Sequence, residues 1–206
     1  MNTLRSKAQT FLKDEDGGPT VEFVIIFPVL FFFVGFILLL AFDFFWMLTM
    51  QKAVERGARM AVTQLPVAGA LIDQGRIVNY ELISNADAGA SCEPGGNCAA
   101  VATYSCRGGG YINQNTAALC DATRFTEIYN EVRRFAPNSI VPADVTITYE
   151  DSGLGRATES YIPLVTVELN QGNGLSSFKW LDGIFSFGNA VRPSVAAAFV
   201  GENLGN

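Results

Sequence analysis

Residues 23–42 form an uninterrupted run of twenty uncharged residues, FVIIFPVLFFFVGFILLLAF. A helix needs about 20 apolar residues to cross the hydrocarbon core of a bilayer, and core helices of soluble proteins are seldom apolar on every face. The apolar part of a cleaved secretory signal is shorter, about 7–15 residues, and a small-residue cleavage site follows it. No such site follows position 42. The run therefore predicts one membrane span, at about 23–42, that stays in the mature protein.

Composition narrows the classes of function. About 140 residues remain once the N-terminal part is set aside, which suits one compact domain. The formal net charge of −6 argues against a nucleic-acid partner, because binding to phosphates needs a basic surface. The chain has no histidine, which removes histidine-based catalytic triads and the commonest metal ligand. We expect no enzyme activity, no cofactor and no metal site.

All four cysteines follow the span, within a Gly- and Asn-rich stretch: Cys92, Cys98, Cys106 and Cys120. Their spacing lacks the C-x2-C pairs of zinc ribbons, and an even number is typical of disulfides formed in an oxidising compartment. Three pairings are possible. We favour neighbours, Cys92 with Cys98 and Cys106 with Cys120, and free buried thiols are the alternative. Because three basic residues precede the span and three follow it closely, only the cysteines favour a C-terminal domain outside the cytoplasm.

A second motif lies just before the span. An acidic stretch ends at Gly17-Gly18, and Glu22 sits where the apolar helix begins. A carboxylate at that depth is costly unless it has a partner. Cleavage after Gly17 would make Gly18 the first residue, and its ammonium could pair with Glu22 of a neighbouring subunit. The alternative is an interfacial glutamate that only interacts with the helix dipole.

These residues resemble a known family. The pattern Gly17, four residues, then Glu22-Phe23 is similar to type IV prepilins, which a dedicated membrane peptidase cuts. With Pro28 and the block Glu55-Arg56-Gly57-Ala58-Arg59, residues 14–64 resemble the TadE/TadF family of pilin-like proteins from tight-adherence (Flp) pilus systems. Pro19 directly follows the proposed new N-terminus, which departs from the family pattern. A cut after Gly18 instead would leave Glu22 fourth, which fits the pattern less well. The sequence does not separate a TadE-like from a TadF-like role.

The resemblance implies a function and its partners. The chain would be a processed pilin-like protein of the bacterial inner membrane that takes part in pilus assembly, with its N-terminus cytoplasmic and its head periplasmic. Its partners would be a prepilin peptidase, other pilin-like subunits and the assembly platform. The resemblance assigns processing to Gly17 and Gly18, subunit register to Glu22 and Phe23, and helix packing to four further residues: Pro28, Gly57, Ala58 and Arg59. The alternative is a membrane-anchored extracytoplasmic enzyme or ligand-binding domain unrelated to pili.

We expect an α+β fold of the type IV pilin kind, with a leader at 1–17, a helix at 18–64 and a head at 65–206. Leu65-Pro66 ends the long helix. Apolar residues at helical spacing predict a second helix at about 123–136. Alternation predicts strands at 145–150 and 164–169 and a third at 194–200, in a three- to four-stranded antiparallel sheet. Residues 76–83 fit either a helical turn or a strand, and residues 107–110 read as a turn.

Two surfaces remain open to interpretation. Small residues recur every four positions at Ala53, Gly57 and Ala61, which allows close packing on a partner helix or on the protein's own head, and we favour the head. The second surface is an aromatic segment between the last two strands. It covers the sheet or, alternatively, contacts the membrane interface or a partner; its possible interface residues are Phe178, Trp180, Phe185 and Phe187.

Overall fold

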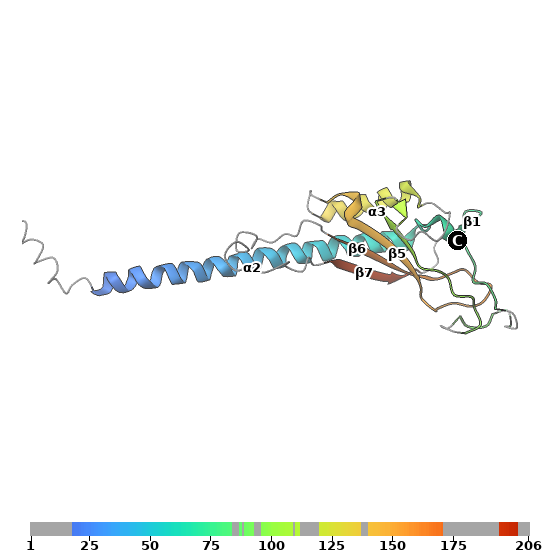
Figure 1. The fold of residues 1–206 in the computed structure, drawn as a ribbon, viewed down its shortest axis with the longest axis horizontal. Coiled ribbons are helices and arrows are strands. Elements are labelled where there is room, and N and C mark those ends of the chain that lie inside the picture. Colours follow the sequence, from blue (N-terminus) through green and yellow to red (C-terminus); the bar gives the residue numbers. More distant parts are fainter. Residues whose placement is uncertain are drawn as a thin grey trace, which may run out of the picture. The chain divides into compact units, whose positions relative to one another are not determined.

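The computed structural model describes residues 18–83, 87, 89–92, 96–108, 110–111, 120–136, 140–170 and 194–201. The chain forms two compact units, Met1–Phe44 and Phe45–Asn206. Helix α2, Gly18–Thr63, runs from the first unit into the second (Figure 1). The model confirms an α+β fold with a long N-terminal apolar helix, one further helix and antiparallel sheets.

The first unit is described from Gly18 onward and consists of the N-terminal part of α2. Its large apolar side chains from Val21 to Phe42 are mostly exposed. Within the described residues, α2 is the one helix long and apolar enough to cross a membrane, and its most apolar stretch is not buried. A helix with such a surface is suited to lipid rather than to water.

The second unit is built on a five-stranded sheet. Its strands are β3 Tyr104–Arg107, β4 Gly110–Tyr111, β5 Val145–Asp151, β6 Pro163–Leu169 and β7 Val195–Val200. The order is β4-β3-β5-β6-β7, and every neighbouring pair is antiparallel. The three strands predicted from alternation are present. The sheet exceeds the predicted three to four strands because β3 and β4 flank the glycines of the predicted turn, where Gly108 has a φ of 58°.

Alternate residues of these strands face the core in cross-strand rows. Ile147 lies opposite Cys106 and Val167, and Val167 lies opposite Ala197. Val145 and Leu169 form part of the next row and are buried. The residues between them on β5 and β6 are less buried, as expected for a sheet that packs one face on a core.

Helix α3, Ala122–Phe135, contributes to that core. The Asp121 carboxylate caps it by accepting hydrogen bonds from the backbone N–H groups of Thr123, at 2.9 Å, and Arg124, at 3.1 Å, as is usual for an aspartate at a helix start. Five large apolar residues form a stripe along α3, and four of them are buried: Phe125, Ile128, Tyr129 and Val132. Phe135 is the exception because it lies at the helix end, where it is 39% exposed.

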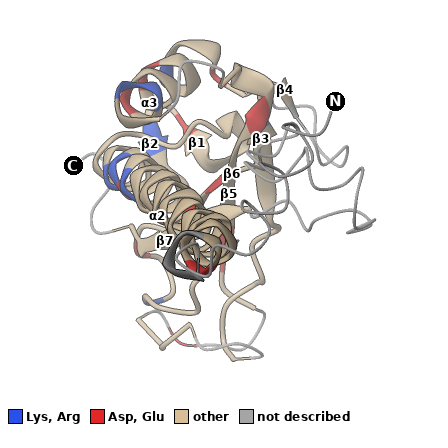
Figure 2. Ribbon diagram, turned by 90° about the vertical axis from the view of Figure 1, so that its left-hand side faces the viewer, with Lys and Arg blue, Asp and Glu red and all other residues tan. Residues whose placement is uncertain are grey.

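The C-terminal part of α2 packs on the protein's own head. Ala53, Ala58 and Ala61 are fully buried. A methyl group at Gly57 would contact Val132 and Ile128 of α3 and Val167 of β6. The small-residue face therefore lets α2 approach both α3 and the sheet closely, in agreement with the favoured interpretation. Figure 2 shows α2 end-on beside α3 and the sheet.

The segment after α2 is extended rather than helical. A short 3-10 helix, Gly69–Leu71, leads into strand β1, Ile72–Asp73, which pairs with β2, Arg76–Ile77. The intervening Gln74 and Gly75 both have positive φ, 49° and 81°, as a tight two-residue hairpin requires. A second 3-10 helix, Pro142–Asp144, precedes β5.

Candidate functional site

The proposed processing and register residues lie at the start of α2. Gly18 is the first residue of the helix, so Glu22 is its fifth. Glu22 and Phe23 are exposed, and the rings of Phe23, Phe27 and Phe31 follow one another along one face at 5.4 and 6.2 Å. This end of the helix therefore presents one carboxylate followed by an aromatic stripe. The leader at 1–17, including Gly17, lies outside the described residues.

Pro28 and the block 55–59 have different surroundings. The helix continues through Pro28, six residues beyond Glu22. In the block, Gly57 and Ala58 are buried, whereas Arg59 faces outward. The Arg59 guanidinium pairs with the Glu55 carboxylate at 2.6 Å and lies 5.7 Å from the centre of the Phe199 ring. The block thus joins the membrane helix to the head, through close backbone packing on one side and an arginine over β7 on the other.

Two disulfides close the head, in the neighbouring pairing favoured above. Cys92 is bonded to Cys98, and Cys106 of β3 is bonded to Cys120. Cys120 lies two residues before α3, and its backbone bridges to Ala68, just beyond α2. The second bond therefore ties β3, which lies between β4 and β5, to the point where α2 and α3 come together.

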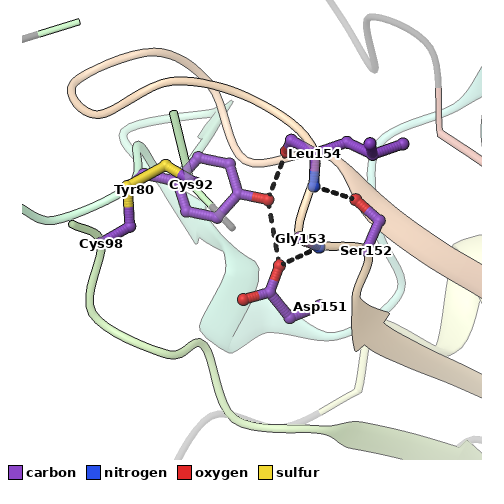
Figure 3. The surroundings of a disulfide bond; sticks show 7 residues. All are labelled: Tyr80, Cys92, Cys98, Asp151, Ser152, Gly153 and Leu154. Carbon is purple, nitrogen blue, oxygen red and sulfur yellow. Dashed lines mark hydrogen bonds between the residues drawn. A yellow bond between two sulfur atoms is a disulfide. The ribbon is translucent and has the colours of Figure 1, made fainter. Parts of the chain in front are cut away.

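Tyr80 lies near the Cys92–Cys98 disulfide (Figure 3). The Tyr80 hydroxyl is 3.0 Å from Oδ1 of Asp151 and 2.7 Å from the carbonyl oxygen of Leu154, and both oxygens are positioned to accept its hydrogen. The same Oδ1 accepts a hydrogen bond from the Gly153 N–H at 3.0 Å. The Tyr161 ring meets the Tyr80 ring edge-on at 5.3 Å. These contacts fix the β5–β6 connection against the segment that carries Cys92.

Burial raises the pKa of three tyrosine hydroxyls above their ordinary value of 10.0. Desolvation, followed by the hydrogen bond and charge of Asp151, raises the pKa of Tyr80 to about 12. Burial raises the pKa of Tyr149 to about 12, and burial together with Asp151 raises the pKa of Tyr161 well above its usual range. At neutral pH these hydroxyls are hydrogen-bonding groups, and their chemistry is that of structural anchors.

Sequence reasoning did not single out these tyrosines. Tyr149 occupies an inward position of a predicted strand, but its hydroxyl accepts a hydrogen bond from the backbone N–H of Val67, 82 residues away. A contact so distant in sequence leaves no local signal. The alternation of β5 predicts only that the side chain at 149 is buried.

The described residues contain no group of three or more cysteine or acidic side chains placed to hold a metal ion. Glu150 and Asp151 are adjacent on β5, and Asp151 is engaged with Tyr80 and Gly153. The aromatic segment with Phe178, Trp180, Phe185 and Phe187 lies outside the described residues.

Comparison with known proteins agrees with the sequence motif. Residues 17–59 match the model of a family described as TadE-like protein. The match begins at Gly17 and ends at Arg59, so it spans the glycine–glutamate motif, the apolar run and the Glu55–Arg59 block. No curated protein and no solved structure matches the chain. The resemblance stated above is therefore confirmed over this segment.

Proposed function

We propose that this chain, whose residues 17–59 are TadE-like, is a processed pilin-like membrane protein with a structural role in assembling a tight-adherence (Flp) pilus. One observation carries the proposal. A single helix holds the motif at its start, an uncovered apolar surface in its first part and a close-packed small-residue face in its second part. Such a helix can anchor a subunit in lipid and transmit its position to the head.

Processing would create the register contact. A prepilin peptidase would remove residues 1–17, and the new ammonium of Gly18 would pair with Glu22 of a neighbouring subunit. Glu22 is exposed at the fifth position of the helix, which leaves its carboxylate open to a partner in another copy. An ion pair is strong in a low-dielectric medium, and it would fix the axial offset between parallel helices.

The disulfides support a topology for the chain in the membrane. Both bonds lie in the unit C-terminal to the apolar run, and disulfides persist in oxidising compartments. The short N-terminal segment would thus be cytoplasmic, and residues 65–206 would form a periplasmic head above the inner membrane. Other pilin-like subunits and the assembly platform would be its partners.

Two measurements test the proposal. First, N-terminal sequencing of the membrane-extracted protein, with and without the peptidase, should give Gly18 as first residue only when the peptidase is present. Second, Glu22→Gln should abolish surface pili, whereas Glu127→Gln, on the exposed side of α3, should leave them unchanged. Normal pilus numbers with Glu22→Gln, together with an uncut leader on the working protein, would contradict the proposal.

A further inference from the structure

Four basic side chains lie on adjacent parts of α2 and α3: Lys52 and Arg56 on α2, and Arg133 and Arg134 in the last turn of α3. All four are exposed. The Arg56 guanidinium lies 5.8 Å from the centre of the Phe135 ring, which brings the two pairs together. Figure 2 shows basic residues on the same side of both helices. We call these four residues the basic patch.

Nearby carboxylates do not neutralise this patch. Glu131 pairs with Arg134 at 3.2 Å, and Glu55 pairs with Arg59, outside the patch, at 2.6 Å. Within the described part of the chain, no ion pair engages Lys52, Arg56 or Arg133. Exposed pairs between neighbouring helical turns are also weak. The patch therefore keeps a positive charge that another surface can use.

The patch lies at the end of the head where α2 enters it. Lys52 follows Trp46 by six residues and Arg56 follows it by ten, which corresponds to about 9 and 15 Å along a helix. Phe44, Phe45 and Trp46 follow the apolar run after one acidic residue, Asp43, and such aromatic residues are typical of the membrane–water interface. Lys52 is thus placed close to the level of lipid headgroups.

Helix α3 runs antiparallel to α2, which brings its own arginines to the same end. Near its start, Arg124 donates a hydrogen bond to the carbonyl of Pro66, at 3.2 Å, just beyond α2. Its last residue, Phe135, lies beside Arg56 instead. The last turn of α3, with Arg133 and Arg134, therefore points back toward the span side of the head.

We propose that the basic patch binds the headgroups of anionic phospholipids on the head side of the membrane. This inference rests on the proposed membrane anchor but not on pilus assembly. Each lysine or arginine near an anionic surface contributes about 1 kcal/mol, equivalent to roughly five-fold in affinity. The attraction falls off within a Debye length, about 8 Å at physiological salt, so it is strongest for Lys52 and when the head lies close to the bilayer.

Lipid quenching of tryptophan fluorescence tests this in the full-length chain. The protein has two tryptophans, so a Trp180→Phe background leaves Trp46 as the reporter next to the patch. The chain is reconstituted in vesicles of brominated phosphatidylglycerol or brominated phosphatidylcholine, and in their mixtures. The ratio of quenching gives the preference of the chain for anionic lipid.

The design compares three double variants with the same change in charge. Lys52→Gln/Arg56→Gln and Arg133→Gln/Arg134→Gln remove halves of the patch. Arg76→Gln/Arg156→Gln removes two exposed arginines from β2 and from the β5–β6 connection. Strand β6 runs antiparallel to α2: Val167 lies beside Gly57, and Val165 lies opposite Phe199, which is beside Arg59. The control residues therefore lie toward the other end of the head.

We expect the parent to prefer the anionic lipid by about five-fold or more at low salt. Lys52→Gln/Arg56→Gln should lose most of this preference and Arg133→Gln/Arg134→Gln a smaller part of it, the control variant should keep it, and high salt should abolish it in the parent. Equal quenching of the parent by both lipids, or equal preference in patch and control variants, overturns the proposal. Unchanged lipid preference with altered self-association in detergent also overturns it, and indicates a second copy as the occupant.

Two further results distinguish a failure of the lipid proposal from a failure of the proposed pilus function. The Glu22→Gln variant should keep the lipid preference, because the carboxylate lies at the opposite end of the apolar run. If that variant also assembles normal pili and the working protein keeps an uncut leader, the pilus proposal fails and the lipid proposal stands. If neither brominated lipid quenches Trp46, the membrane anchor itself is wrong and the lipid proposal falls with it.

Discussion

Gly57 of helix α2 lies directly against Val132 of helix α3, with no space for a side chain between them. A Cβ atom at position 57 would overlap Cγ2 of Val132 and would lie 3.7 Å from Cγ2 of Ile128 and from Cγ1 of Val167. The overlap involves a β-branched side chain that is fully buried and stiff about χ1. The contact therefore sets how closely the C-terminal part of α2 can approach α3.

Gly57→Ala should destabilise the head. Overpacking a close-packed core costs about 1–3 kcal/mol, which exceeds the gain of up to about 1 kcal/mol from replacing a helical glycine by alanine. Gly35→Ala is the matched control, because it is in the same helix and a Cβ atom there meets nothing within 4 Å. Denaturant unfolding of the full chain in detergent measures both variants. Equal stability of the two would contradict this account of the packing.

The helices and strands predicted from residue pattern agree with the structure where the pattern is long. The apolar run, the apolar stripe of α3 and the alternating residues of β5 and β6 each extend over several residues and keep one pattern throughout. Strand β4 has only two residues, Gly110 and Tyr111, and two residues define no period. The β3–β4 hairpin therefore read as a turn, and only its pairing with β5 makes it part of the sheet.

Only part of the candidate site could be predicted from the sequence, because some of its contacts join distant segments. Gly57 is recognisable because small residues recur every four positions around it, and the structure places it in a tight interface. Tyr80 belongs to residues 76–83, which fit two kinds of structure, and its acceptors lie more than 70 residues away. Hydrogen bonds that join distant segments depend on the assembled fold, and no local pattern specifies them.

Tyr149 anchors the residue that follows the end of α2. Its buried hydroxyl accepts a hydrogen bond from the Val67 N–H at 3.0 Å. Tyr149→Phe leaves that amide without this acceptor, and an unsatisfied buried donor costs about 1–3 kcal/mol. Denaturant unfolding should show the loss. Thr148→Val is a control on the other face of β5, where the hydroxyl is only partly buried, and it should change stability less.

Alkaline pH should destabilise the head through the same residue. Burial raises the pKa of Tyr149 from 10.0 to about 12 in the folded state. Because the folded pKa is the higher one, the stabilisation is fully present below pH 10 and is lost as the pH rises through about 12. The free energy of unfolding of the parent should fall over this window. Tyr149→Phe should show a smaller fall, and an identical pH profile would contradict the assigned cause.

Gly155 packs against the ring of Tyr80. Its φ is 122°, and a Cβ atom there would lie 2.6 Å from Cε2 of Tyr80. Gly155→Ala should therefore combine backbone strain with displacement of the ring. Gly75→Ala is the control, because Gly75 also has a positive φ, 81°, but nothing lies within 4 Å of the added atom. We expect the Gly155 variant to lose more stability, by about 1–3 kcal/mol, and to exchange backbone hydrogens faster around Tyr80.

The two disulfides should contribute unequally to stability. Cys106–Cys120 closes a separation of 14 residues and Cys92–Cys98 one of 6, so the loop-entropy model assigns about 3 kcal/mol to the first and about 2 kcal/mol to the second. The Cys106–Cys120 bond also connects β3 to the start of α3, whereas the Cys92–Cys98 bond lies within the segment that meets the β5–β6 connection. Cys106→Ser/Cys120→Ser should therefore lower the unfolding free energy more than Cys92→Ser/Cys98→Ser. Mass spectrometry of the unreduced protein checks that the remaining pair still forms in each variant, and a larger loss from the 92–98 pair would contradict the expected order.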